Sequence, residues 1–232
     1  GMGILIFAIA LMPSLGISGQ NIAVSEAPGP SLDKVTPKMS DTAKTLYIIY
    51  LLFTIIETIM LMLGGMSLYD SLITSFGSVG TGGLSNYSDS IGHFDSTYIR
   101  MVITAFMFLC GVNFNLYFLS LKHGLKTFTR DSEFKLYVFV FAAASLFIFA
   151  ALLISGQYDE VLPAFSDSVF QVSSILTTTG FITADYETWP IVCQMVLLML
   201  MFIGGCSSST GGGIKVVRVL VLLKLIRRGI ST

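Results

Sequence analysis

Four long apolar stretches dominate the sequence and limit what it can fold into. They cover residues 45–68, 97–121, 134–154 and 190–226. A helix needs about 20 mainly apolar residues to cross a bilayer, so each stretch is long enough to span one. The composition agrees with this interpretation, because 53% of the residues are apolar and only 12% are charged, against about 25% in soluble domains. The sequence therefore predicts an all-α integral membrane protein and argues against a soluble enzyme.

Charged residues divide between the two sides of this predicted topology. If the spans alternate in direction, Arg100 is the one basic residue that falls on the outer side. The twelve on the other side are Lys34, Lys38, Lys44, Lys122, Lys126, Arg130, Lys135, Lys215, Arg218, Lys224, Arg227 and Arg228. Loops rich in Lys and Arg are cytoplasmic, so this side is predicted to face the cytoplasm of a cell whose inner (plasma) membrane holds the chain. A net charge of −1 gives no basic footprint for nucleic acid.

Acidic residues gather on the predicted outer side. A mouth rich in carboxylates concentrates cations, although a merely soluble rim explains any single carboxylate equally well. The residues are Asp70, Asp89, Asp95, Asp159, Glu160, Asp167, Asp185 and Glu187.

The two outward-facing connections, about residues 69–95 and 156–188, repeat each other. Each is too short and polar to add a span and too apolar for a plain loop, so each is predicted to hold a re-entrant helix followed by an extended strand. Repeats of one topology imply pseudo-symmetry about an axis along the membrane normal. At an offset of 97 residues the matching pairs are Asp70 and Asp167, Ser71 and Ser168, Thr81 and Thr178, and Gly83 and Gly180.

The extended parts of the two connections, called the Thr/Gly strands below, have the composition of an ion filter. The first holds Gly80, Thr81, Gly82 and Gly83, and the second holds Thr177, Thr178, Thr179 and Gly180. Rings of backbone carbonyls can replace the water shell of a monovalent cation, and glycine permits the dihedrals that aim successive carbonyls at one axis. The alternative is a Gly/Thr turn in a surface loop, which the recurrence at one offset disfavours.

The last apolar stretch is interrupted by a segment that makes a poor helix interior. A buried loop that faces the pore would obstruct ions and move, with glycines as hinges; a static helix kink remains an equal alternative. The predicted gating loop consists of Gly204, Gly205, Cys206, Ser207, Ser208, Ser209, Thr210, Gly211, Gly212 and Gly213. Glu57, inside the first full span, is either functional or a partner for a polar group on a neighbouring helix.

These motifs together resemble the Trk/Ktr/HKT superfamily of potassium transporters, and within it the TrkH type. The resemblance is carried by residues 80–85, 173–181 and 203–218, with a linker-like segment at 26–37. It implies four span–pore helix–span repeats around one pore with pseudo-fourfold symmetry, and a key filter glycine that maps to Gly83 and Gly180. It further implies K⁺ coordination by Thr81, Gly82, Gly83, Thr178, Thr179 and Gly180, a gate at 204–213, a homodimer, and a cytoplasmic nucleotide-binding ring of the TrkA type.

On this resemblance the chain divides into four parts and is expected to be a piece of a longer protein. Residues 1–20 would end the last helix of repeat one, 21–43 would form a cytoplasmic linker, 44–130 would form repeat two, and 131–232 would form repeat three. The expected function is K⁺ uptake, by symport or otherwise, with no enzymatic activity and no covalently bound cofactor. The alternative is a membrane scaffold that docks a cytoplasmic regulator and conducts nothing.

Overall fold

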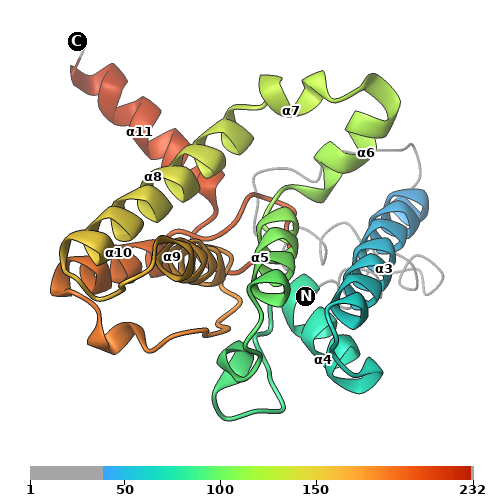
Figure 1. The fold of residues 1–232 in the computed structure, drawn as a ribbon. Coiled ribbons are helices and arrows are strands. Elements are labelled where there is room, and N and C mark those ends of the chain that lie inside the picture. The colour runs from blue at the N-terminus through green and yellow to red at the C-terminus, as the bar shows by residue number, and fades with distance from the viewer. Residues whose placement is uncertain (1–38, 231–232) are drawn as a thin grey trace.

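The computed structural model describes residues 39–230, which form helices joined by short connections (Figure 1). The predicted segment 1–20 lies outside the described residues, as does most of the predicted linker 21–43. The helices are α3 (Met39–Leu63), α4 (Leu68–Val79), α5 (Thr97–Cys110), α6 (Phe114–His123), α7 (Lys126–Arg130), α8 (Ser132–Ile154), α9 (Val161–Leu176), α10 (Ile191–Phe202) and α11 (Val216–Ile230). Two short 3₁₀ helices, η2 (Ser90–His93) and η3 (Tyr186–Thr188), lie in the outer connections.

Two of the predicted spans are single helices long and apolar enough to cross a membrane. They are Leu46–Leu63 within α3 and the whole of α8. The prediction of one helix over 97–121 was wrong in shape, because α5 and α6 meet at a bend of 85°. The side chain of Asn113 causes the new start by accepting a hydrogen bond of 2.9 Å from the N–H of Asn115, as an N-cap does.

The two predicted re-entrant helices are present as α4 and α9. α4 begins at the N-cap Ser67, whose hydroxyl accepts from the N–H of Asp70, and has its C-cap at Gly80. The part of α9 from Ser166 to Ser174 is enclosed on all sides, since every residue in it is buried. A helix that carries several serines and is still buried all round must lie among other helices, which is the position of a pore helix.

α5 stands between two groups of helices (Figure 1). It packs on α3 and α4 on one side and on α9 on the other, and α9 in turn packs on α8 and α10. One buried apolar cluster runs through this junction and includes Leu61 of α3, Met107 of α5 and Phe170 of α9. α6 and α7 form an arch that leads to α8, and α11 points away from the bundle.

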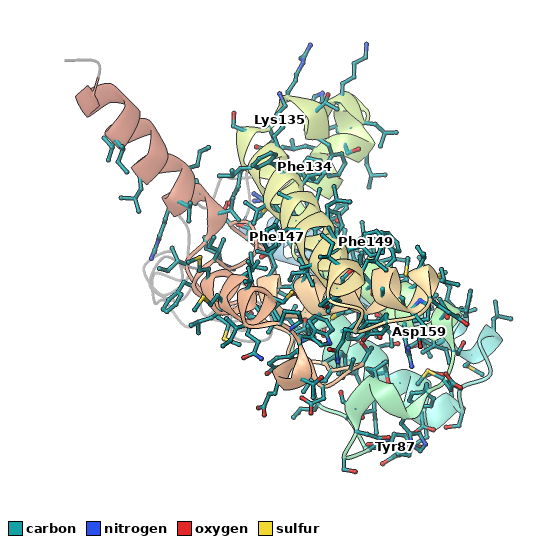
Figure 2. The ribbon with its side chains drawn as sticks, turned by 60° about the vertical axis from the view of Figure 1, so that its left-hand side comes forward. Tyr87, Phe134, Lys135, Phe147, Phe149 and Asp159 are labelled. Carbon is teal, nitrogen blue, oxygen red and sulfur yellow. The ribbon has the colours of Figure 1, made fainter. Side chains whose placement is uncertain are left out.

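The outer connection that holds Tyr87 and the start of α8 lie at opposite ends of the described part of the chain. Figure 2 shows Tyr87, from an outer connection, at one end and Lys135, at the start of α8, at the other. The helical membrane architecture expected from the sequence is confirmed for residues 39–230, with α3, α4 and α5 followed by a second series of α8, α9 and α10.

Candidate ion pathway

Both Thr/Gly strands leave their re-entrant helix through the same backbone conformations. The first residue after each helix cap is a threonine with positive φ, 51° at Thr81 and 58° at Thr178. Two residues later, Gly83 and Gly180 have φ of 61° and 90°. Residues other than glycine rarely adopt the left-handed region, and bulky or β-branched ones are outliers there. The two strands, 97 residues apart, therefore share a strained backbone conformation as well as a composition.

The hydrogen bonds of the two strands also correspond. In each strand two successive N–H groups donate to one carbonyl oxygen in the last turn of the preceding helix. Gly82 and Gly83 donate to Gly77 at 2.7 and 3.2 Å, and Thr179 and Gly180 donate to Ser174 at 2.8 and 3.3 Å. The two acceptors are again 97 residues apart. Each strand thus turns its donors back toward its own helix.

Most carbonyl oxygens of the strands have no donor, and the exception is that of Gly80, which accepts from the hydroxyl of Thr81 at 2.8 Å. None from Thr81 to Gly83, and none from Thr177 to Gly180, accepts a hydrogen bond from any residue in the range 39–230. Gly82 and Gly180 are exposed, and Thr81, Gly83 and Thr178 are half-buried. Two short rows of unpaired carbonyls are the group arrangement that can replace the hydration shell of a cation.

The two strands lie directly against each other. A Cβ atom placed on Gly83 would overlap the carbonyl oxygen of Thr179 and lie 3.0 Å from the carbonyl carbon of Gly180. By contrast, a Cβ placed on Gly82 or on Gly180 would meet no described atom within 4 Å. The strands are therefore packed together on one side and face open space on another.

The predicted gating loop contacts both strands where they leave their re-entrant helices. The hydroxyl of Thr81 donates to the carbonyl of Thr210 at 2.9 Å, and the N–H of Gly212 donates to the hydroxyl of Thr178 at 2.6 Å. A Cβ on Gly211 would lie 2.9 Å from the carbonyl oxygen of Thr177. The structure thus brings all three predicted site segments together.

The loop is seated in the bend between α5 and α6. Cys206 donates its N–H to the carbonyl of Gly111 at 2.8 Å, and Phe114 donates its N–H to the carbonyl of Ser208 at 3.1 Å. The two ends of the loop meet in a parallel bridge between Ile203 and Ile214. The break in the last apolar stretch is therefore a closed loop with its own hydrogen bonds, a more elaborate structure than a simple kink.

Two buried charged residues hold this loop from below, and the sequence reasoning missed both roles. Glu133, 7% exposed, accepts from the N–H and hydroxyl of Ser207 at 2.6 and 2.7 Å and from the N–H of Val217 at 3.1 Å. Lys215, 1% exposed, donates to the hydroxyl of Ser209 at 3.3 Å and to the carbonyl of Gly211. A signal existed in the position of Lys215, because a lysine directly after a glycine-rich break has no exposed helix face to occupy.

Asp70, in the first turn of α4, and Asp167, in the middle of α9, each fasten the segment that follows the Thr/Gly strand. Asp70 accepts from the amide of Asn86 at 3.1 Å, and Asp167 accepts from the hydroxyl of Thr183 at 2.9 Å. Asn86 and Thr183 are also 97 residues apart. The hydrogen bond from Ser67, with those from Asn86 and Tyr87, holds the pKa of the Asp70 carboxyl below its usual value.

Asp167 differs from Asp70 in its surroundings. It is 4% exposed, accepts from Tyr158 at 2.9 Å, and pairs with Arg100 at 3.5 Å. The grouping of Asp167 with the cation-collecting carboxylates was therefore wrong, because its oxygens are already bound inside the protein. Arg100, the one basic residue on the predicted outer side, belongs to this pair.

Glu57 is fully buried and contacts the pore helix α4. One carboxyl oxygen accepts from the hydroxyl of Ser78 at 2.6 Å, and the other has no hydrogen-bond partner among residues 39–230. At the next residue of α3, the hydroxyl of Thr58 donates to the hydroxyl of Ser75 in α4 at 3.0 Å. Ser78 of α4 is therefore the polar partner on a neighbouring helix that one of the two interpretations of Glu57 expected.

Comparison with known proteins decides the family. Residues 1–232 match the TrkH family, described as cation transport protein. The chain belongs to the TrkH cation transport family. It is 39% identical to the Trk system potassium uptake protein TrkH of Salmonella typhimurium, over 97% of this chain and 47% of that protein. It is 36% identical to the Trk system potassium uptake protein TrkG of Escherichia coli, over 100% of this chain and 48% of that protein.

A solved structure agrees with this membership. The crystal structure of the potassium transporter TrkH from Vibrio parahaemolyticus has a TM-score of 0.83 and 35% identity, and the match covers 99% of this chain and 47% of that one. The chain thus spans about half the length of the TrkH relatives it matches. The resemblance stated from the sequence motifs is confirmed.

Proposed function

We propose that this chain supplies two of the strands that form a K⁺ filter and so takes part in K⁺ uptake across the inner membrane. The observation that carries the proposal is the pair of adjoining Thr/Gly strands, in which the carbonyl oxygens of residues 81–83 and 177–180 accept no hydrogen bond from the described residues. The ligands for dehydrated K⁺ are the carbonyls of residues 81–83 and 178–180, with K⁺ as the transported substrate. Relatives named as potassium uptake proteins support the choice of ion.

The loop at 204–213 acts as a gate in this proposal. It lies against the inner ends of both strands, so an ion that leaves the filter meets it next. Its contacts with the strands are two hydrogen bonds, each of which contributes only about 0.5–1.5 kcal/mol. Movement of the loop would also have to release Thr210 from the carbonyl of Cys110 and Gly211 from Lys215, while Glu133 keeps Ser207 in place.

The orientation and partners follow from charge and from the resemblance. The basic loops face the cytoplasm under the positive-inside rule, which places the Thr/Gly strands at the outer mouth and α11 on the inner side. α11 projects away from the other helices (Figure 1), as a helix that docks a cytoplasmic subunit would. We infer that the full-length protein forms a homodimer and binds a nucleotide-binding regulator of the TrkA type.

Rubidium uptake in cells that lack their own K⁺ uptake systems tests the filter. The variant is Gly180→Ser in the full-length protein, and the matched control is Gly156→Ser. Both glycines have positive φ, 90° and 69°, and in both cases an added Cβ meets no described atom within 4 Å. Backbone strain is therefore similar, while only Gly180 belongs to a Thr/Gly strand. The filter proposal expects Gly180→Ser to lose uptake or K⁺ preference and Gly156→Ser to keep both; equal behaviour favours the non-conducting scaffold.

A further inference from the structure

An apolar pocket opens under the arch formed by α6 and α7, away from the Thr/Gly strands. Its volume is about 490 Å³, within the range of about 300–1,000 Å³ typical of sites for small molecules. The lining side chains are apolar or aromatic except that of Ser120. They come from five helices and include Leu52 and Ile56 of α3, Phe108 of α5, Leu121 of α6, Phe128 of α7 and Phe134 of α8.

Two lysines are next in sequence to residues that line this pocket. The corner between α6 and α7, residues 121–126, is exposed throughout, and it places two lysines next to two leucines that line the pocket. Lys122 follows Leu121, which is 85% exposed, and Lys126 follows Leu125, which is 78% exposed. Neither lysine forms an ion pair with a residue in the described range. From Phe114 to Arg130 the sequence contains no acidic residue.

The position of the pocket fits the inner surface of the membrane. α6 leaves α5 at 85°, so it cannot continue along the same direction through the bilayer. Figure 2 shows Phe134 and Lys135 near each other at the end of the molecule opposite Tyr87. Exposed leucines interleaved with lysines are characteristic of segments that lie in the membrane interface, and the cytoplasmic leaflet carries the anionic lipids that attract such segments.

We propose that this pocket binds an anionic phospholipid of the cytoplasmic leaflet. One acyl chain occupies the apolar pocket, and the phosphate headgroup lies between Lys122 and Lys126. An acyl chain is the ligand that an almost wholly apolar cavity open to the bilayer accepts, and the unpaired lysines beside Leu121 and Leu125 select a negative headgroup. The proposal relies on the orientation given above but not on ion conduction.

Native mass spectrometry of the purified full-length protein tests it, with phosphatidylglycerol and phosphatidylethanolamine of identical acyl chains as probes. Each lysine near an anionic lipid surface contributes about 5-fold to binding, and the pair roughly 30-fold. The Lys122→Gln/Lys126→Gln variant should therefore retain phosphatidylglycerol about 30-fold less well than the unmodified protein. The matched control is Arg218→Gln, which removes one exposed positive charge that is not next in sequence to a pocket residue and should change retention little, whereas Lys122→Gln alone should lower it about 5-fold.

A second variant tests the acyl chain separately from the headgroup. Ser120→Trp fills the pocket and should reduce retention of both lipids, while Gly180→Ser should leave retention unchanged even where it abolishes uptake. Equal loss of lipid in the lysine variants and the control, or equal retention of the two lipids by the unmodified protein, would overturn the role of the lysines. Normal retention by a folded Ser120→Trp protein would overturn the role of the pocket. The absence of any retained lipid, because another part of the protein or a second copy fills the pocket, would overturn the whole proposal.

Discussion

The hydroxyl of Thr81 donates a hydrogen bond of 2.9 Å to the carbonyl oxygen of Thr210, 129 residues further along the chain. This bond joins the first Thr/Gly strand to the loop that interrupts the last apolar stretch. The corresponding threonine of the second strand, Thr178, makes the reciprocal contact by accepting from the N–H of Gly212. The loop is therefore attached to both strands, and the strength of this attachment sets how readily it moves away.

Removal of the Thr81 hydroxyl should loosen the gate. Thr81→Val keeps the shape of the side chain and removes its hydrogen-bond donor. The free energy that holds the loop against the strand should fall by about 0.5–1.5 kcal/mol. We expect a higher maximal rate of rubidium uptake in cells, because the loop leaves its closed position more often. Thr127→Val is the control, since it removes an exposed hydroxyl that bonds the carbonyl of Gly124 at 2.9 Å far from the loop. An unchanged or lower rate in Thr81→Val alone would count against a mobile loop.

Glu133 should stabilise the base of the loop through its oxygens more than through its charge. Glu133→Ala leaves the N–H groups of Ser207 and Val217 without their acceptor, at a cost of about 1–3 kcal/mol for each buried group. Glu133→Gln retains one acceptor oxygen for both. Thermal unfolding in detergent should show a clear loss of stability for the alanine variant and a much smaller loss for the glutamine variant. Equal losses would show that the negative charge, facing Lys215, is what matters.

The pair of Arg100 and Asp167 should behave as a unit. Removing one partner of a buried ion pair is expected to cost about 3–5 kcal/mol, whereas removing both costs less because no uncompensated charge remains. Arg100→Gln and Asp167→Asn should each lower the unfolding temperature, and the double variant should recover part of the loss. Asp70→Asn is the comparison at the matching position, where the carboxylate is partly exposed and has no arginine. Additive losses in the double variant would mean that the two side chains act independently.

The sequence pattern was sufficient for the features that depend on local chemistry. Two Thr/Gly segments at one offset, each after a short apolar helix, predicted the paired strands, and ten small residues inside an apolar stretch predicted the broken span. The structure has both features because glycine permits the positive φ found in the strands and a run of small residues makes a poor helix interior. The shared φ values at Thr81 and Thr178 show that the repeat extends to the backbone.

Features that depend on tertiary packing were not predictable in the same way. The bend between α5 and α6 occurs where a side chain at Gly111 would collide with the hydroxyl of Tyr137 and lie 2.8 Å from the methyl group of Thr177. Hydropathy alone averages over such a bend, although Asn113 offered a capping signal. Likewise, Asp167 is bound inside the protein by Arg100, 67 residues earlier, and by Tyr158 in the connection before α9, and the sequence gave no sign of either pairing.

If the contact between the two Thr/Gly strands creates a K⁺-selective filter, K⁺ selectivity should depend on Gly83. A Cβ on Gly83 would overlap the carbonyl of Thr179 and would also strain a residue with φ of 61°, whereas a Cβ on Gly82 meets no described atom within 4 Å. The measurement is rubidium flux into liposomes that contain the purified full-length protein, in competition with Na⁺ and with K⁺, for Gly83→Ala and Gly82→Ala. The account predicts that Gly83→Ala loses its preference for K⁺ over Na⁺ while Gly82→Ala keeps it. Undiminished K⁺ preference in a folded Gly83→Ala protein would contradict it.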